Sequence, residues 1–494
     1  MNASDEPKAG PAALPLEMSA AQRHQLLDAA GILLDQLRER VDTSPIFSAA
    51  PPELVERVLE PPPEDAAPLT EVFDRLRDAA SVGWNKAHGG SLAFIPNSGL
   101  FSGSIAALLS AGINPFTGAA FEAPALVGLE ESVLRWLAGL FGLPAATEGV
   151  LLSGGSMANQ TAVACARHRG FDAARSRAYL SERAHHSLHK ALYLSGIPQH
   201  CVIPIPCVGG QRIDIGALTA RVKLDVASGL QPWMIVGVAG STDTGSIDDL
   251  RALSVISRQH GAWFHVDAAY GGMFVLTERG AARLQGIDSA DSITVDAHKG
   301  LMLPYGVGAL LVRHPGVLAE SHAGTGNYMR DVPQLPGLPH YFERGPELTR
   351  PFRGLLVWLP LQLHGVGEFR NVLNRSLDLA VDAAQRLRVI PGIVVLADPE
   401  LSITAFREAR GDAITERIIT AINQSGRFQV SSTSLEGHIY IRLAFLHLRA
   451  TSESIAELVA IVAGEAGAFC AGAPERGDVR SLVSVKSEAA RRSR

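Results

Sequence analysis

The chain has 494 residues, of which 47% are apolar and 19% charged, and its formal net charge is −6. This composition is ordinary for a globular protein, and the slight acidic excess gives no reason to expect nucleic acid or an anionic membrane surface as a partner. The four cysteines are too few for a disulfide framework, and no apolar run reaches the roughly 18 residues of a membrane-spanning helix. The N-terminus lacks the apolar stretch of a signal peptide, so we expect a cytoplasmic protein.

The N-terminal part of the sequence predicts a tail followed by a helical arm. Residues 1–18 are small, polar and proline-containing, which is typical of a disordered tail. Ser19 and Gln22 have the spacing of a capping box and predict a helix that continues to about Arg40. Proline clusters interrupt the remainder of the segment 19–90. We therefore expect an arm that gains stability by lying on another surface.

A regular pattern of short apolar runs and helical stretches follows, and we assign residues 91–367 to a large domain. This alternation predicts a doubly wound α/β domain with a mostly parallel sheet. In such sheets, ligands bind beyond the carboxyl ends of the strands. The expected central strands are 149–152, 178–180, 233–239, 262–268 and 292–295, and the expected intervening helices include 157–167 and 248–260.

A smaller C-terminal α+β domain is expected at residues 368–472, followed by a flexible tail at 473–494. It should begin with a long helix, because the apolar positions from 368 to 388 recur at helical spacing. The other expected elements are strands at 393–396, 401–406 and 439–445 and helices at 412–425 and 451–463.

The first segment that indicates chemistry is a glycine turn. Residues 151–159 read Leu-Leu-Ser-Gly-Gly-Ser-Met-Ala-Asn, an expected strand that enters a turn and then a helix. Free backbone N–H groups and the positive end of a helix dipole favour an anion at such a turn, and Ser156 can add a hydroxyl. The segment therefore fits a phosphate site, and a plain strand–helix turn is the alternative.

Two further segments follow successive expected strands. Asp267 ends one of them, where a carboxylate must be paired or hydrogen-bonded to stay charged. The protonated nitrogen of a pyridine ring is such a partner, and a structural hydrogen bond is the alternative. Lys299 follows the next strand, beside His298. A lysine after a buried strand is a poor structural choice, but it suits an amine that has to attack an aldehyde.

Together and in this order, the three segments resemble the group II pyridoxal-5′-phosphate (PLP) decarboxylases, which include aromatic-L-amino-acid and glutamate decarboxylases. The resemblance is firm over residues 91–313. It implies the PLP-dependent transferase fold (aspartate-aminotransferase-like, fold type I), PLP as cofactor, and decarboxylation of an L-amino acid to an amine and CO₂. The other motifs that carry it are Asn114-Pro115-Phe116, Glu122-Ala123-Pro124, Ala184-His185-His186-Ser187 and Gly240-Ser241-Thr242.

The resemblance also implies roles for the matching residues. Lys299 would carry the cofactor covalently, Asp267 would bind the ring nitrogen, His185 would stack on the ring, and Ala269 would pack beneath it. Gly155 and Ser156 would hold the phosphate. The remaining expected cofactor contacts are Gly154, Ser241, Asp296 and His298.

Two positions depart from the family pattern. Asp296 stands where relatives often have asparagine, and a second anion beside a phosphate is unfavourable. Gly300 replaces a tryptophan, so we expect looser packing at that point. His185 and His189 have a spacing that could hold zinc on one helical face, but the segment lacks the glutamate of a zinc-protease motif and no third ligand follows nearby.

The resemblance implies a fourth catalytic residue besides Lys299, His185 and Asp267. Tyr328 follows a glycine-rich stretch at about the distance of the mobile-loop tyrosine that is thought to protonate the carbanion in relatives. A surface aromatic is the alternative. The substrate pocket would draw on Asn97, Phe116 and Gly118 of the partner subunit in a homodimer. These side chains favour an aromatic substrate no more than a small polar or acidic one.

Other reactions on the same scaffold stay open, because a fold does not fix a reaction. Arg442, on an expected C-terminal strand, could clamp the substrate α-carboxylate and would then suit an aminotransferase, whereas a structural salt bridge is the alternative. Aldolase-type cleavage and oxidative deamination to an aldehyde are further possibilities. A PLP-binding regulator without turnover is the most distant one, since the sequence shows no clear helix-turn-helix.

Overall fold

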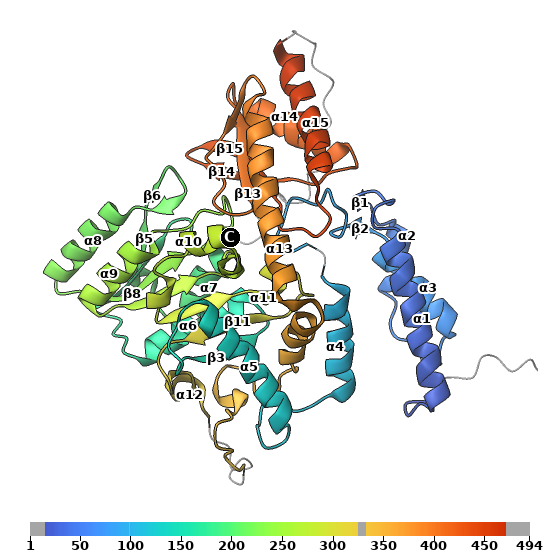
Figure 1. Cartoon of the computed structure of the whole chain (residues 1–494), viewed down its shortest axis with the longest axis horizontal. Coiled ribbons are helices and arrows are strands. Elements are labelled where there is room, and N and C mark those ends of the chain that lie inside the picture. Colours follow the sequence, from blue (N-terminus) through green and yellow to red (C-terminus); the bar gives the residue numbers. More distant parts are fainter. Residues whose placement is uncertain (1–14, 98, 325–331, 471–494) are drawn as a thin grey trace, which may run out of the picture.

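The computed structural model describes residues 15–97, 99–324 and 332–470 (Figure 1). The tail predicted at 473–494 and most of the one predicted at 1–18 lie outside these residues. The helix α1 (Ala20–Glu39) begins at the predicted capping box, in which the Ser19 hydroxyl and the Gln22 side chain each accept a hydrogen bond from the other residue's backbone N–H. This prediction is confirmed. The arm also contains α2 (Pro52–Val58), α3 (Leu69–Ala80) and the antiparallel pair of β1 (Phe47–Ser48) with β2 (Gly83–Trp84).

A seven-stranded sheet forms the centre of the described large domain. Its strand order is β3-β11-β10-β9-β8-β4-β5, and β11 is the strand that runs antiparallel to its neighbours. The prediction of a mostly parallel sheet is confirmed. The strands are β3 (Glu148–Leu152), β4 (Ser176–Ser181), β5 (Val202–Ile205), β8 (Gln231–Val238), β9 (Trp263–Asp267), β10 (Ser292–Val295) and β11 (Gly308–Val312).

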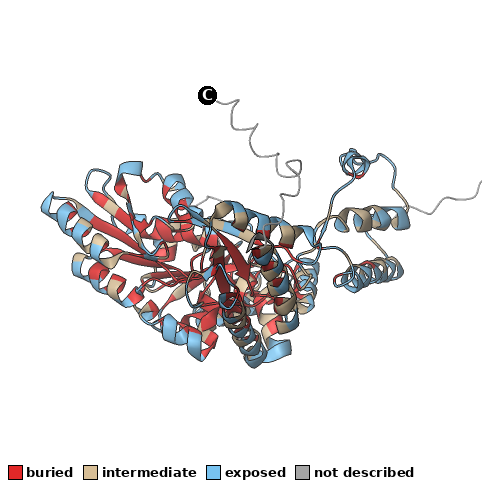
Figure 2. Ribbon diagram, turned by 90° about the horizontal axis from the view of Figure 1, so that it is seen from above, coloured by how far each residue is buried: buried red, intermediate tan, exposed pale blue. Residues whose placement is uncertain are grey.

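The strands are apolar along their length because helices cover the sheet. Every residue of β9 and β10 is buried, as expected for central strands of a covered parallel sheet. Figure 2 shows these buried strands between half-exposed helices. The helix α6 packs on β10 and β11, and α9 packs on β8 and β9. The helices are α4 (Phe101–Ile113), α5 (Pro124–Leu140), α6 (Gly155–His168), α7 (His186–Leu194), α8 (Ile215–Ala227), α9 (Leu250–His260), α10 (Glu278–Arg283), α11 (Ala297–Gly300) and α12 (Val317–His322).

A second, antiparallel sheet builds the C-terminal part, with the order β12-β13-β15-β14 and its own apolar core. The strand β14 was not predicted, because its sequence, Ser-Ser-Thr-Ser-Leu, has the polar composition of a loop. The long helix α13 begins at Gly354, earlier than expected, and its backbone is non-helical at Gly365 (φ 71°). The elements are α13 (Gly354–Arg388), β12 (Ile393–Val395), β13 (Ile403–Glu408), α14 (Asp412–Gln424), β14 (Ser431–Leu435), β15 (His438–Ala444) and α15 (Ser452–Cys470).

A buried ion pair supports the strand that leads into the glycine turn. The Arg350 guanidinium lies 2.5 Å from Glu130 Oε1 and also donates to the carbonyl oxygen of Leu151 in β3. Both side chains of the pair are 1% exposed or less. Such a pair fixes the position of β3, because loss of either partner would leave an unpaired charge in the interior. Among the described helices, none is both long and apolar enough to cross a bilayer.

Candidate active site

The residues predicted to carry chemistry follow strands whose carboxyl ends meet at one edge of the sheet. Asp267 is the last residue of β9, and the parallel register pairs it with Thr294 of β10. Two residues after Thr294, Asp296 caps the short helix α11, which carries Lys299. The glycine turn follows β3, and His185 follows β4. Strands of one sheet that run in the same direction therefore bring together side chains that are far apart in sequence.

These side chains line one cavity of about 330 Å³, a volume in the usual range for small-molecule sites. Its lining also includes Asn159, Ser187, Tyr270 and Tyr305, for which no role was expected from the sequence. The predicted residues that it brings together are Gly154, Gly155, Ser156, His185, Asp267, Ala269, Asp296, His298 and Lys299.

The backbone of the glycine turn is shaped for a close approach. Gly154 has φ 153°, which favours glycine, and it caps α6 without a side-chain hydrogen bond. A Cβ on Gly155 would lie 3.0 Å from the Ala269 Cβ and 3.1 Å from Asp296 Oδ2, so a side chain there would fill the turn. The uncapped first-turn N–H groups of α6 and the positive end of its dipole fit a phosphate.

The buried Asp267 carboxylate is held by neutral donors. Asn159 Nδ2 donates to Oδ2 at 3.0 Å, and the backbone N–H of Ala269 donates to Oδ1 at 3.1 Å. No lysine or arginine of the described chain forms an ion pair with it. A pyridinium N–H would supply the cationic partner that a buried carboxylate favours, so the residues fit the ring of PLP.

Lys299 contacts a second buried carboxylate, that of Asp296. Its Nζ is 3.0 Å from Asp296 Oδ2, and Asp296 is 2% exposed. The other oxygen, Asp296 Oδ1, is buried and has no hydrogen-bond partner among the described residues. Asp296 therefore contacts the lysine and lies against Gly155. A Cβ on Gly308 would collide with the unpartnered oxygen, which is therefore packed inside the protein beside the glycine turn.

Burial keeps two histidines of the site neutral. It lowers the pKa of His185 and of His298 below the ordinary value, with burial the largest cause for both. His185 caps α7, and its Nδ1 lies 2.7 Å from Ser187 Oγ. His298 Nδ1 lies 2.7 Å from the carbonyl oxygen of Val307 and therefore carries the proton. No cluster of three or more histidine, cysteine or acidic side chains that could hold a metal occurs among the described residues.

Several predicted site residues lie elsewhere. Ser241 does not line the cavity, and its hydroxyl is 2.8 Å from that of Thr244. The Arg442 guanidinium donates to the carbonyl oxygens of Ala93, Thr242 and Asp243 and to the Ser431 hydroxyl, an arrangement that favours a structural role. The residues expected from a partner subunit are absent from the lining of this single-chain cavity, and Tyr328 lies outside the described residues. The former are Asn97, Phe116 and Gly118.

The expectation of loose packing at Gly300 is wrong. Gly300 is buried, and a Cβ there would lie 2.7 Å from Met273 Cγ, so Met273 occupies the adjacent space. The residues that form hydrogen bonds within the site and that were not assigned from the sequence are Asn159, Ser187 and His265. His265 precedes Asp267 by two positions on β9, so strand periodicity places both side chains on one face of the sheet. That periodicity was the available signal.

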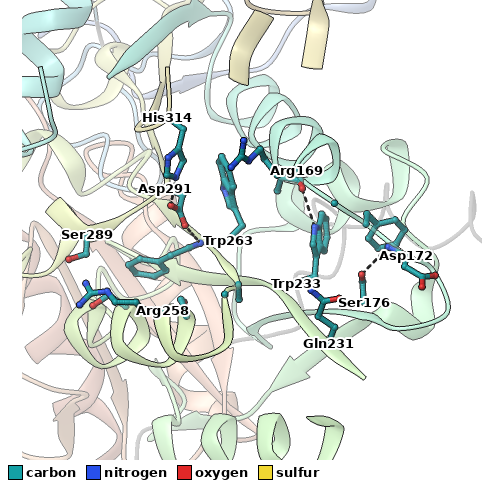
Figure 3. Close-up of a pocket in the computed structure, with 18 residues that line it drawn as sticks. Arg169, Asp172, Ser176, Gln231, Trp233, Arg258, Trp263, Ser289, Asp291 and His314 are labelled. Atoms are coloured by element: carbon teal, nitrogen blue, oxygen red, sulfur yellow. Dashed lines mark hydrogen bonds and ion pairs between the residues drawn. The ribbon is translucent and has the colours of Figure 1, made fainter. Parts of the chain in front are cut away.

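A larger cavity, of about 610 Å³, lies at the opposite edge of the sheet (Figure 3). Ser176, Gln231 and Trp263, which begin β4, β8 and β9, contribute to its lining. Its wall also carries the pair of Asp291 and His314, 2.6 Å apart. This lining shares no residue with the cavity of Lys299 and includes no lysine. The residues suited to PLP are therefore at the carboxyl edge.

Comparisons with known proteins agree with this geometry. The family model of the pyridoxal-dependent decarboxylase conserved domain matches residues 52–409. Aromatic-L-amino-acid decarboxylase of Bacillus atrophaeus is 30% identical over 90% of this chain and 95% of its own length. L-2,4-diaminobutyrate decarboxylase of Rhizobium meliloti (strain 1021) is 32% identical over 68% of this chain and 69% of its own. Phenylacetaldehyde synthase of Arabidopsis thaliana is 26% identical over 82% and 87%.

The fold agrees as well. A solved structure of Oryza sativa TDC with PLP and tryptamine superposes with a TM-score of 0.86, at 21% identity, over 92% of this chain and 99% of that one. This likeness confirms the PLP-dependent transferase fold of type I. The family match covers well over half of the sequence and includes the glycine turn, Asp267 and Lys299. The chain therefore belongs to the pyridoxal-dependent decarboxylase family and is a PLP-dependent carboxy-lyase that acts on an amino acid.

Proposed function

We propose that this chain releases the α-carboxylate of an L-amino acid as CO₂ in the cavity at the carboxyl edge of the sheet, with Lys299 as the residue that carries PLP. One observation carries the proposal. A lysine amine, an uncapped glycine turn and a buried aspartate that pairs with no lysine or arginine of the described residues line the same cavity. When bound, PLP supplies an electron sink for the electron pair that CO₂ leaves behind.

The residues of the chain hold and orient the reactants. Asp267, whose carboxylate is fixed by Asn159 and Ala269, would accept a hydrogen bond from the pyridine nitrogen and favour its protonated form. The first turn of α6 would hold the phosphate through backbone N–H groups. The neutral ring of His185 and the side chain of Ala269 would contact the cofactor ring.

Asp296 is assigned to Lys299 rather than to the phosphate. Its carboxylate lies 3.0 Å from the lysine Nζ, and a direct contact with a phosphate dianion would be repulsive. Asp296 would keep the Lys299 side chain beside the cavity whenever that side chain does not carry the cofactor. This role also explains why an acidic residue is tolerated next to an anion site.

The proton that replaces the carboxylate at Cα is assigned to Tyr328, with His185 as an aid. The assignment of Tyr328 is supported by the family resemblance, since the structure does not describe residues 325–331. His185 lines the cavity and carries a lowered pKa, so it is neutral at pH 7. Phenylacetaldehyde synthase is among the similar proteins. The fate of this proton therefore separates amine formation from aldehyde formation.

The substrate pocket is proposed to include Asn97, Phe116 and Gly118 of a partner subunit. Asn97 is buried next to Leu446, and the Phe116 ring packs over Gly118, where a Cβ would lie 2.8 Å from the ring. Similar proteins are named for aromatic amino acids and for L-2,4-diaminobutyrate. An L-amino acid with an aromatic or a polar side chain is thus the proposed substrate class. Arg442 could bind the α-carboxylate of a transamination substrate only if its hydrogen bonds to the backbone carbonyl oxygens were broken.

A homodimer is proposed on the evidence of the arm. Figure 2 shows α1, α2 and α3 extending from the body of the chain, and their apolar side chains are largely exposed. Such a surface is unfavourable in a monomer and favours a second copy as its cover. The exposed arm side chains are Leu27, Ile32, Leu34, Val55, Val58, Leu59, Val72 and Leu76. A sedimentation measurement that finds an active monomer would contradict the proposed homodimer.

A cytoplasmic location is also proposed. It is supported by the three free cysteines within the described residues.

The reaction is tested by incubating the PLP-loaded protein with a panel of L-amino acids. Amine and CO₂ are followed together with ammonia, hydrogen peroxide and 2-oxo acid consumption. Equal amounts of amine and CO₂ from at least one amino acid are expected. Amino transfer to 2-oxo acids without CO₂, or CO₂ with an aldehyde in place of the amine, would contradict the proposed reaction.

A further inference from the structure

A continuous chain of buried hydrogen bonds links the two edges of the large sheet. It begins at Trp263, whose Nε1 donates to Ser292 Oγ at 2.8 Å, and Ser292 Oγ lies 2.8 Å from His265 Nδ1. His265 Nε2 lies 3.1 Å from Asn159 Oδ1. Asn159 Nδ2 then makes two bonds of 3.0 Å, to Asp267 Oδ2 and to Ser187 Oγ. The chain ends at His185.

The direction of every bond in this chain is fixed by chemistry. The Asp267 carboxylate can only accept, so Asn159 must turn its NH₂ group towards it and its oxygen towards His265. His265 is fully buried, and burial lowers its pKa to about 4, so the ring is neutral with its proton on Nε2. Its Nδ1 is then an acceptor and receives a hydrogen bond from the Ser292 hydroxyl. At the other end, Trp263 is a donor only.

The same logic reaches His185. Ser187 Oγ accepts a hydrogen bond from Asn159 Nδ2, so the Ser187 hydroxyl can donate its own hydrogen bond to His185 Nδ1, 2.7 Å away. The backbone N–H of Ser187 also donates to this nitrogen, at 3.3 Å. The backbone contact requires an unprotonated Nδ1, and the hydroxyl of Ser187 can then donate to the same nitrogen, so the proton of the neutral ring is on Nε2. Asn159 is the branch point from which the carboxylate and the histidine are both held.

We propose that Asn159 is a positioning residue that holds Asp267 and His185 in one hydrogen-bond arrangement, so that cofactor affinity and the tautomer of His185 are set together. The inference rests on the proposed function, in which Asp267 binds the ring nitrogen and His185 covers the ring. Asn159 is 1% exposed and 108 residues from Asp267 in sequence, and both its NH₂ hydrogens and its oxygen form hydrogen bonds within this chain of bonds. A side chain without both functions cannot replace it.

Two variants separate the branches. Asn159→Leu keeps the volume and removes both branches, whereas Ser187→Ala removes only the branch to His185. PLP affinity is measured by equilibrium dialysis, and the protonation of the His185 ring nitrogens by ¹⁵N NMR of histidine-labelled apoprotein, with His185→Gln for assignment. Wild type should show a protonated Nε2 and an unprotonated Nδ1. Trp263→Phe removes the distant donor, at the wall of the cavity in Figure 3, and serves as a control for general loosening.

For Asn159→Leu we expect a PLP affinity lower by about 10- to 150-fold, the weight of one hydrogen bond to a charged group, together with a His185 ring that populates Nδ1–H. Ser187→Ala should change the His185 signal and alter PLP affinity less than about threefold. Trp263→Phe should leave both near wild type. If Asn159→Leu does not fold, Asn159→Ala is used, since it removes the donor to Asp267 and the acceptor for His265 without adding a charge.

Wild-type affinity or an unchanged His185 signal in the Asn159 variant would overturn the inference. So would an equal loss of affinity in Ser187→Ala, which would indicate a merely structural effect. Failure of the proposed function is recognised separately, because it would appear in wild type as cofactor attachment to a lysine other than Lys299.

Discussion

Replacement of Asp267 by asparagine tests the role of the carboxylate with little change in shape. Both carboxylate oxygens accept from donors, Asn159 Nδ2 and the Ala269 N–H, so the new NH₂ group faces a donor in either orientation. An unsatisfied buried donor costs about 1–3 kcal/mol, so the apoprotein should unfold a few degrees earlier. Loss of the charged partner of the pyridine nitrogen removes about 1.5–3 kcal/mol, so PLP should dissociate about 10- to 150-fold more easily.

Asp248→Asn is the matched control. Asp248 is equally buried, and its two oxygens also accept backbone N–H groups, those of Ile213 and Val238, each at 2.8 Å. The control should lose stability like Asp267→Asn but bind PLP within about twofold of wild type, since it lies outside the cavity. The assays are thermal unfolding of the apoproteins and PLP titration. An Asp267→Asn protein with wild-type PLP affinity would refute the assignment of the ring nitrogen to Asp267.

Three further predictions address the proton donor, the interior and the pH dependence. Tyr328→Phe should bind PLP normally but release amine about 10²–10⁴-fold more slowly, with more carbonyl product, because a general acid has been removed; amine at the wild-type rate would assign the proton to another group. Arg350→Met removes the ion-pair partner of the buried Glu130 and should lower the free energy of unfolding, measured in urea, by about 3–5 kcal/mol. A loss of less than about 1 kcal/mol would contradict the importance of this buried ion pair. Burial lowers the pKa of His447 to about 4, because the folded protein disfavours the charged imidazolium. The resulting contribution to the free energy of unfolding, of the order of 1–3 kcal/mol, is fully present above pH 6.5 and is lost as the pH falls from about 6.5 to 4. His447→Gln should therefore lose less stability than wild type over that range, and parallel unfolding curves for the two proteins would be the contrary result.

The central sheet could be predicted from the sequence because its burial is visible there. β9 and β10 are covered on both faces and read as apolar runs, and the chemically distinctive residues stand at their ends. Adjacent parallel strands necessarily bring these ends together, so Asp267 and Lys299 could be placed at one site. The family resemblance added the roles, which neither periodicity nor spacing determines.

The hydrogen bonds that organise the site could not be predicted in the same way. Asn159 and His265 are 106 residues apart, and their contact depends on how α6 packs against β9. The strand β14 was missed for a related reason: it is an edge strand, and its three serines and one threonine give no apolar signal. The packing at Gly300 could not be predicted either. Whether the space beside this glycine is empty or filled depends on a side chain distant in sequence, here that of Met273.

Reduction of the PLP-loaded protein with borohydride, followed by peptide mapping, tests most directly whether Lys299 carries the cofactor. The holoprotein should be yellow, lose its colour on reduction and yield one labelled peptide that contains Lys299. Lys86 is the informative comparison, because its Nζ lies 2.8 Å from the hydroxyl of Tyr305, a residue that lines the same cavity. A label on Lys86 or on any other lysine, or no label at all, would contradict the assignment of the active site.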